Sequence, residues 1–347
     1  MPRRACQAAQ LSAMGNEYSR MQETETIVGC VDASTQDCWY VFKVETIIMI
    51  GILFEHPTWL TPLFDALDQR RLAYEKIDVS HFSYEMTPSA VLPLYLNRLS
   101  ASSYQRQHQQ AIACALSYIQ WLTAHGARVL NAHNAHLEVN KVDQLLAFTQ
   151  HGLRIPRTWV FNHVNQLPLL PKDFPFPLLV KPAQGGAGSL ILRFDSWEAL
   201  QEGAGAITAP PDGLMLAQAY VCPAEGYINR VEILGDKLLY ALKVYPSDNF
   251  NLCPADACEV DVGAPSQAQF FLHETLDPTL LDTILRFFAR LKLDYGSIEF
   301  LRGNDGHIYF YDLNLNSNYR TTLPGVQHFD PWGQLADYLA AQLPVVS

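Results

Sequence analysis

The chain has 347 residues, 49% of them hydrophobic and 17% charged, and carries a formal net charge of −11. This composition is typical of a globular protein with two or three domain cores, and the acidic balance without a basic run argues against nucleic acid or anionic membranes as partners. The longest apolar run, near Ile47–Phe54, is too short to span a bilayer, and no apolar stretch follows Arg3 and Arg4 to make a signal peptide.

The N-terminal segment differs from the rest of the chain. Residues 1–44 mix polar side chains with isolated aromatic ones and show no sustained hydrophobic period. We therefore expect a poorly ordered extension with, at most, a short β-element around residues 39–44. The seven cysteines are odd in number and form no CxxC pair, so we expect a reducing, cytoplasmic location.

The pattern sharpens from Ile47 onward. A buried strand at 47–54, a helix with Thr61 as cap and Pro62 as first residue, and a strand at 74–79 follow one another. This β-α-β order predicts a small parallel α/β domain over residues 45–130. A longer helix at 103–125 and a short strand at 129–130 complete that domain.

The second half of the chain alternates between helices and hairpins. We expect a helix capped by Asn140 and closed by Gly152, a hairpin about Gly235-Asp236, a helix opened by Asp277-Pro278, and a final amphipathic helix at 332–343. A strand, glycine loop, strand, helix and strand are expected between residues 175 and 220.

A second predicted hairpin turns at Asp305-Gly306. Pairing about those two residues places His307 opposite Asn304, Phe310 opposite Leu301 and Asp312 opposite Glu299. Asn314 shares a face with Asp312, because strand side chains alternate. Like charges directly across a ladder are destabilising, so two facing acids with a neighbouring amide favour a Mg²⁺ site. The alternative is an exposed hairpin with scattered polar residues.

A glycine-rich turn joins two further expected strands. Lys181 ends the first strand, Leu178–Pro182, and the residues up to Ser189 form the turn. Glycines let backbone N–H groups approach phosphate oxygens, and the lysine supplies a positive charge beside them. The order fits neither the Walker pattern nor the dinucleotide GxGxxG pattern. A flexible hairpin tip is the alternative.

Other candidate residues lie on the expected helices and strands. Lys141 begins the Asn140 helix, where the helix dipole disfavours a cation unless a partner such as phosphate lies nearby; a solvated surface lysine is the alternative. Gln218 lies in an apolar strand that could present hydrogen bonds to an adenine edge. Arg230 and Lys243 lie on the two strands of the Gly235-Asp236 hairpin, where each could reach a phosphoryl group or form a surface ion pair.

Taken in chain order, these residues resemble the ATP-grasp superfamily, most of all its RimK-like (glutamate ligase-type) branch. The resemblance covers about residues 131–324. It rests on Asn140-Lys141 and Val180-Lys181-Pro182 for the two ATP lysines, Gly185-Gly186-Ala187-Gly188 for the phosphate-covering loop, Gln218 for the hinge, Ile228-Asn229-Arg230 for an Asp-Ile-Arg-like motif, and Glu299 with Asp312-Leu313-Asn314 for the metal motif.

The resemblance implies an α/β (α+β) fold in which two α+β lobes clasp ATP, preceded by the small parallel α/β domain. It assigns residues 131–347 to the ATP-grasp domain, with a glycine-loop lobe at about 157–218. ATP and Mg²⁺ are the implied cofactors, with two ions and Mn²⁺ as a substitute. The implied nucleotide contacts are Lys141, Lys181, Gln184, Gly185, Gly186, Ala187, Gly188, Ser189, Gln218, Ala219, Tyr220 and Glu225, and the implied metal ligands are Glu299, Asp312 and Asn314.

Three departures from the family pattern stand out. Ala219 occupies the position of a nucleotide-contacting Glu, for which Glu225 is the candidate replacement. Glu299 stands where an Asp is usual. In the stretch 248–254, Asn251 matches the family but the expected arginine is absent.

The implied activity is an ATP-dependent ligation of a carboxylate to an amine through an acyl phosphate, with release of ADP and phosphate. Arg230, Lys243 and Asn251 would serve the moving phosphoryl group, and Arg320 or Arg98 would pair with a substrate carboxylate unless they form structural salt bridges. An ATP-grasp small-molecule kinase and a non-catalytic nucleotide-binding module are the alternatives. The acid, the amine and a homo-oligomeric state are left open.

Overall fold

The computed structural model describes residues 28–30, 39–41, 49–87, 90–186, 188, 190–246 and 268–344. Strand β1 (Val28–Cys30) pairs antiparallel with β2 (Trp39–Val41). The latter confirms the short β-element expected near residue 39, and the remainder of the N-terminal extension lies outside the described residues. No helix in the described ranges is long and apolar enough to cross a membrane.

The first of the larger sheets is wholly parallel, with strand order β4-β3-β5-β6. It comprises β3 (Ile50–Phe54), β4 (Tyr74–Asp78), β5 (Leu94–Arg98) and β6 (Arg128–Val129). Helix α1 (Thr61–Gln69) packs on one face and α2 (Gln109–Ala124) on the other, since their buried residues fall in different core clusters. Gly51 is required here, because a Cβ on it would lie 2.3 Å from the Tyr95 ring.

Three details of this region differ from the sequence expectations. Strand β5 was not expected, although it is central and buried on both faces. The helix expected over 103–125 is broken into η3 (Ser103–Arg106) and α2, because Gln107 has a left-handed φ of 66°. Leu60 rather than Thr61 precedes the first helical residue of α1, after the short helix η2 (Pro57–Leu60).

The other two sheets are antiparallel and mixed with helices. A four-stranded sheet has the order β7-β10-β8-β9, and a five-stranded sheet has the order β13-β12-β11-β14-β15. Their strands are β7 (Thr158–Phe161), β8 (Leu178–Pro182), β9 (Leu192–Phe194), β10 (Met215–Ala219), β11 (Ile228–Leu234), β12 (Lys237–Tyr245), β13 (Gln269–Leu272), β14 (Tyr295–Arg302) and β15 (Ile308–Asn314).

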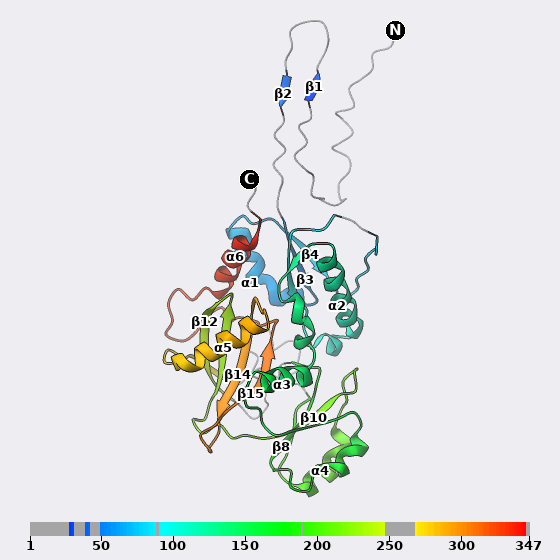
Figure 1. Cartoon of the computed structure of the whole chain (residues 1–347), viewed down its shortest axis with the longest axis vertical. Helices are drawn as coiled ribbons and strands as arrows, with labels where there is room; N and C mark the ends of the chain where they lie inside the picture. The colour runs from blue at the N-terminus through cyan, green and yellow to red at the C-terminus, as the bar shows by residue number, and fades with distance from the viewer. Residues whose placement is uncertain are drawn as a thin grey trace.

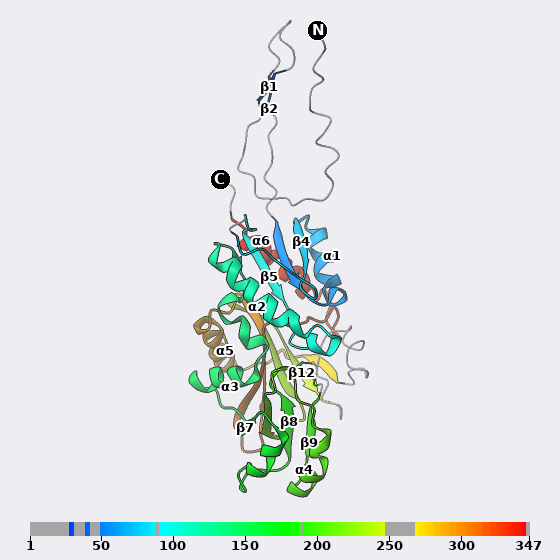
Figure 2. The same cartoon turned by 90° about the vertical axis from the view of Figure 1, so that its right-hand side faces the viewer.

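The helices of this half are α3 (Lys141–Gln150), α4 (Trp197–Gly203), α5 (Pro278–Arg290) and α6 (Pro331–Gln342), with short 3-10 turns η4 (Ala132–Glu138), η5 (Val164–Leu169) and η6 (Ala204–Ala206). The five-stranded sheet lies between the parallel sheet and the four-stranded sheet along the long axis of the molecule (Figures 1 and 2). Asn140 and Asp277 cap α3 and α5 as expected, each accepting two backbone N–H groups. Strand β13 was not expected.

The β14–β15 register confirms one predicted pairing and corrects two. Glu299 lies opposite Asp312, as expected, but Phe310 pairs with Phe300 rather than Leu301. The backbone of His307 pairs with Gly303 instead of Asn304, so the turn is one residue longer than expected. A bulge at Tyr311 shifts the register back. The longer turn and the bulge shift the register in opposite directions. The simple count from the turn therefore still pairs Glu299 with Asp312.

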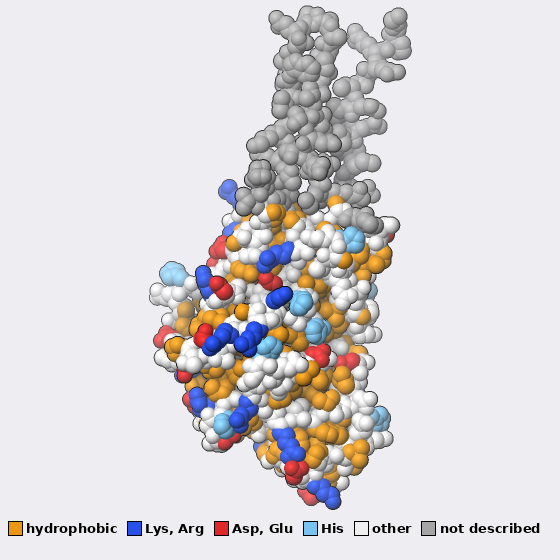
Figure 3. Space-filling view, viewed as in Figure 1, with side chains coloured by type: hydrophobic (Ala, Val, Ile, Leu, Met, Phe, Trp, Pro, Cys, Tyr) orange, Lys and Arg blue, Asp and Glu red, His pale blue; other side chains and the backbone are white. Residues whose placement is uncertain are grey.

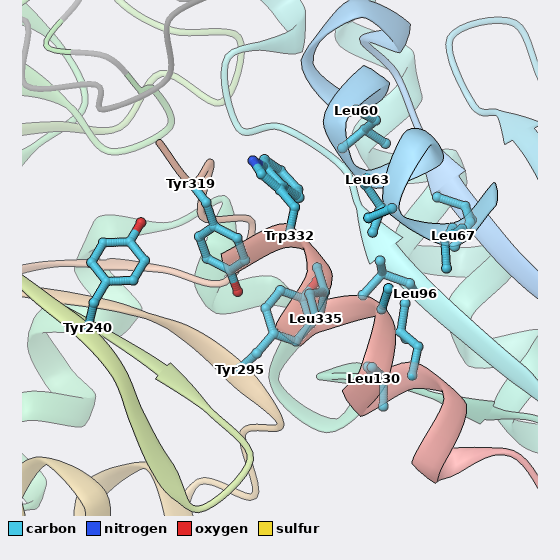
Figure 4. Packing of buried hydrophobic residues seen from close by; sticks show 14 of the residues in the cluster. Leu60, Leu63, Leu67, Leu96, Leu130, Tyr240, Tyr295, Tyr319, Trp332 and Leu335 are labelled. Carbon is cyan, nitrogen blue, oxygen red and sulfur yellow. The ribbon is translucent and has the colours of Figure 1, made fainter. Parts of the chain in front are cut away.

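One hydrophobic cluster joins the parallel sheet to the five-stranded sheet. Leu63 of α1 and Leu335 of α6 are fully buried in it, together with Tyr295 of β14. Helix α6, with Trp332 and Leu335, lies between α1 and the tyrosines (Figure 4). On the surface seen in Figure 3, basic and acidic side chains lie beside one another among scattered hydrophobic ones.

Truncation of Leu335 tests this packing. Leu335→Ala should reduce the free energy of unfolding by about 2–5 kcal/mol, because it leaves a cavity in a fully buried site. Urea unfolding followed by circular dichroism measures the loss. Leu146→Ala on α3 is the matched control, since Leu146 is 52% exposed and should change stability by about 0.5 kcal/mol or less.

Candidate functional site

A cavity of about 210 Å³ lies where the four-stranded and five-stranded sheets meet the loop that follows β5. Twelve of the residues singled out from the sequence line it: Lys141, Lys181, Gly185, Gly186, Gly188, Gln218, Ala219, Tyr220, Arg230, Glu299, Asp312 and Asn314. Residues that are far apart in the sequence and come from α3, β8, β10, β11, β14 and β15 therefore share one cleft.

An ion pair between Lys141 and Asp312 lies at the centre of the cleft. The Lys141 ammonium donates to Oδ1 of Asp312, and the Asn314 amide donates to Oδ2 at 2.9 Å. Burial disfavours the charged form of both the Lys141 ammonium and the Asp312 carboxylate, but the opposite charge of each partner stabilises that form. The pKa of Asp312 is accordingly lowered and that of Lys141 raised. The start of a helix disfavours a positive charge, and the Asp312 carboxylate offsets that effect for Lys141 at the start of α3.

A second buried cation, Arg230, holds the facing acid. Its NH1 donates to Glu299 at 2.7 Å, its Nε to Glu232 at 2.7 Å and its NH2 to the Ser317 hydroxyl at 2.6 Å. All four residues are at most 5% exposed. Burial is the main reason that the pKa of Glu299 is raised, with the Asp312 charge adding to it and Arg230 opposing it.

Lys181 lies at the end of β8 next to the glycine segment. Burial, together with the Lys141 charge, lowers the pKa of Lys181 to about 8. Within the described part of the chain no hydrogen bond or ion pair joins its ammonium to an acid, although its Nζ lies 6.0 Å from the centre of the Tyr311 ring. The backbone N–H of Lys141 donates to the carbonyl of Ala183, which ties the start of the glycine segment to α3.

The wall of the cleft near β10 is largely apolar. Leu179 and Ile191 line it beside Ala219 and Tyr220. Gln218 is 3% exposed and donates to the Thr158 hydroxyl at 2.9 Å. An apolar wall beside the Gln218 amide suits a nucleobase. Leu179 and Ile191 were not predicted as lining residues.

Sequence reasoning also missed Glu138, which lies in η4 and lines the cleft. Its Oε2 accepts the backbone N–H groups of Leu315 at 2.6 Å and Asn316 at 2.9 Å. Burial raises the pKa of Glu138 to about 7. No signal in the sequence could have found it, because η4 has no periodic pattern and its contact partners lie about 177 residues away along the chain.

Four further predicted residues do not line the cleft. Lys243 pairs with Asn229 across β11 and β12, so it faces the opposite side of the sheet from Arg230, and its Nζ lies 4.8 Å from the Tyr227 ring. Glu225 is exposed. Arg320 donates to the Thr322 carbonyl at 3.1 Å, and Gln184 is buried in the segment after β8. The predicted residues Ala187, Ser189 and Asn251 lie outside the described residues.

Solved structures share this architecture. The ATP-grasp ligase PsnB, in complex with a phosphomimetic variant of its minimal precursor, Mg and ADP, superposes with a TM-score of 0.60 at 16% identity over 84% of this chain and 98% of that one. The chain has the ATP-grasp fold. The fold predicted from the ordered motif set is thereby confirmed.

Two other structures extend the likeness. A RimK-domain ATP-grasp protein from Sphaerobacter thermophilus DSM 20745 gives a TM-score of 0.58 at 16% identity over 84% of this chain and 99% of that one. The VanG D-Ala:D-Ser ligase from Enterococcus faecalis gives 0.59 at 11% identity over 85% and 98%. No protein-family model and no curated protein sequence matches the chain.

The donor set of this cleft fits Mg²⁺. Glu299 and Asp312 lie opposite each other and Asn314 lies on the same face as Asp312. Mg²⁺ is commonly bound by one or two carboxylates together with substrate phosphates. Within the described residues no cluster of three or more His, Cys, Asp or Glu side chains could hold a metal by itself.

Removing the Arg230 charge should show how strongly the folded state depends on it. Arg230→Met leaves Glu232 and Glu299 buried without their counter-ion, and we expect a loss of about 3–5 kcal/mol in unfolding free energy. Urea unfolding at neutral pH measures the loss. Arg230→Lys keeps the charge but not the three-way contact and should lie in between. An unchanged midpoint for Arg230→Met would contradict this assignment.

Proposed function

We propose that the chain is an ATP-dependent ligase that joins a carboxylate to an amine through an acyl phosphate, releasing ADP and phosphate. The observation that carries the proposal is that two lysines, Arg230 and two facing acids line one cleft beside a glycine segment. The proposal is supported by neighbours of the same fold that are named as ligases, among them PsnB, solved with Mg and ADP, and the VanG ligase.

The residues have distinct roles in the proposed reaction. Lys141 and Lys181 hold phosphate oxygens, while the apolar wall at Leu179 and Ala219 receives the adenine. A substrate carboxylate oxygen attacks the γ-phosphorus and ADP leaves. The amine then attacks the acyl carbon, loses a proton and expels phosphate. Holding the reactants in line accounts for about 7–11 kcal/mol of such a barrier.

Arg230 and the glycine segment serve the intermediate. Arg230 would stabilise negative charge on the moving phosphoryl group, at the cost of loosening its contact with Glu299. The glycine segment would close over the phosphates, because an acyl phosphate must be kept from water. Mg²⁺, as two ions that Mn²⁺ can replace, would be held by Glu299, Asp312 and Asn314 and would neutralise phosphate charge. We propose a cytoplasmic location, because ATP is available there.

A hydroxylamine-trapping screen tests the proposal. The full chain is incubated with Mg²⁺, ATP, hydroxylamine and one member at a time of a panel of amino acids and small carboxylic acids. Ligase chemistry should yield a hydroxamate and ADP in equal amounts with at least one acid. AMP instead of ADP would contradict the proposal, because it indicates adenylation.

Two other outcomes would identify the alternatives. A stable phosphoester product with an alcohol substrate would indicate a small-molecule kinase. Tight ATP binding without turnover across the whole panel would indicate a non-catalytic module, an outcome that Ala219 in place of an acid would then explain.

Asp312 provides a direct test of the metal assignment. Asp312→Ala should abolish Mg²⁺-dependent ATP turnover, by at least about 100-fold, while the circular dichroism spectrum stays native. Asp282→Ala is the matched control, because Asp282 lies on α5 and is exposed, in an ion pair with Arg286. Retained turnover in Asp312→Ala would refute the assignment.

Lys181 should make nucleotide binding dependent on pH. Only the protonated ammonium attracts phosphate, and its pKa in the free protein is about 8. ADP affinity should therefore fall as the pH rises above 8, by at most about tenfold per pH unit. Binding is accompanied by proton uptake, which isothermal titration in buffers of different ionisation enthalpy measures. Lys181→Arg, which stays charged, should remove the fall; a fall of equal size in that variant would contradict the assignment.

A further inference from the structure

Two buried acids share the Arg230 guanidinium, and only one of them lines the cleft. Glu299 on β14 lines it together with Arg230, whereas Glu232 on β11 does not. Glu232 is 0% exposed, and its Oε1 accepts both Arg230 Nε and the Ser317 hydroxyl at 2.7 Å. Burying a carboxylate is costly, and no step of the proposed reaction uses this one.

The backbone register and Ser317 hold Glu232 beside Arg230. The two residues are two positions apart on β11, so their side chains share one face of the sheet. Arg230 NH2 donates to the Ser317 hydroxyl at 2.6 Å, and that hydroxyl donates in turn to Glu232. Arg230, Ser317 and Glu232 therefore form a closed set of hydrogen bonds, and the remaining guanidinium bond, from NH1, goes to Glu299.

The charges of this cluster do not balance. Glu299 alone would neutralise Arg230, so the Glu232 carboxylate leaves one negative charge in excess. Burial disfavours such an excess, and an apolar side chain at position 232 would cost less. The excess does have an effect at the cleft. Because Glu232 also compensates Arg230, the Glu299 carboxylate keeps part of its attraction for a second cation.

Without Glu232, Arg230 and a divalent cation would compete for the Glu299 carboxylate. Arg230 would also lose its last anionic partner among the described residues on moving towards a phosphoryl group. Glu232 Oε2 is buried and has no hydrogen-bond partner in the described part of the chain. It can therefore accept a further guanidinium N–H when NH1 leaves Glu299.

We propose that Glu232 is a positioning residue that keeps Arg230 paired while Glu299 becomes available to Mg²⁺. Glu232 thereby raises the Mg²⁺ affinity of the site without contacting either the metal or the nucleotide. The inference rests on the proposed function, since it requires that Mg²⁺ and a nucleotide bind together in this cleft. It deepens that proposal by assigning control of metal affinity to a residue behind the cleft wall.

The test measures how strongly Mg²⁺ and ADP assist each other's binding. Isothermal titration calorimetry gives the dissociation constant of ADP for the full chain, once with saturating Mg²⁺ and once with EDTA. The ratio of the two constants is the coupling. Glu232→Gln keeps the shape of the side chain but removes its charge. Asp282→Asn is the matched control, because it removes an exposed negative charge of α5 that lies outside the cleft.

The expected result is a loss of coupling without a loss of nucleotide binding. In Glu232→Gln the coupling should fall by at least about fivefold, while the dissociation constant for ADP in EDTA stays within about twofold or falls. The Mg²⁺ concentration for half-maximal ATP turnover should rise by a similar factor. Glu232→Asp, which keeps the charge on a shorter side chain, should recover part of the coupling, and Asp282→Asn should match the wild type.

Ser317→Ala provides a second variant if Glu232→Gln does not fold. It leaves every charge in place but removes the hydroxyl that joins Glu232 to Arg230 NH2. The coupling should then fall by about twofold or more, because the guanidinium is held less firmly against Glu232. Wild-type coupling in a folded Ser317→Ala would contradict the inference.

Two further results would overturn the inference while leaving the ligase proposal intact. Wild-type coupling in Glu232→Gln, even with a lower urea midpoint, would indicate a structural role only. Equal weakening of ADP binding with Mg²⁺ and with EDTA would indicate a distorted cleft and not a weakened metal site. A wild-type protein that binds no ADP, or binds it equally well with and without Mg²⁺, would refute both the inference and the proposed function.

Discussion

Buried opposite charges on the five-stranded antiparallel sheet and on the neighbouring helix α3 organise the cleft of this molecule. Two sets of side chains are ionised although they are buried: Lys141 with Asp312, and Arg230 with Glu299 and Glu232. None of these groups could stay charged away from water without its partner. Lys141–Asp312 joins α3 to β15 and Arg230–Glu299 joins β11 to β14, whereas Arg230 and Glu232 both lie on β11. These four elements must therefore come together before the buried charges are compensated.

Side chains rather than another strand complete the outer edge of the five-stranded sheet. Gln144 on α3 accepts the N–H of Leu313 and donates to its carbonyl, and Glu138 accepts the next two free N–H groups along the chain. An unpaired edge strand would invite pairing with another chain. Here one of the two side chains that satisfy the edge, Glu138, also lines the cleft, so the strand that carries Asp312 and Asn314 has hydrogen-bond partners at its edge without a further strand.

The sequence predicted what depends on local pattern and failed where distant contacts decide. Caps, hairpins and strand ends placed Lys141, Lys181 and the facing acids correctly in their elements. Strand β5 was missed, because five residues that end in Asn97 and Arg98 carry little local signal although the strand is central. Glu138 was missed for the same reason. Alternation within β12 would have shown that Lys243 faces away from Arg230, had its pairing with Asn229 been known.

Asn131 gives the molecule a fixed part and a movable part. Its side chain and backbone bond to Asp294, Tyr295 and Leu315, while Asp294 also binds Arg128. The parallel sheet is thereby fastened to the five-stranded sheet, whereas the four-stranded sheet has a hydrophobic core of its own. We therefore expect the cleft to open mainly by movement of the four-stranded sheet relative to the other two sheets, and this opening would limit how fast a bound molecule leaves.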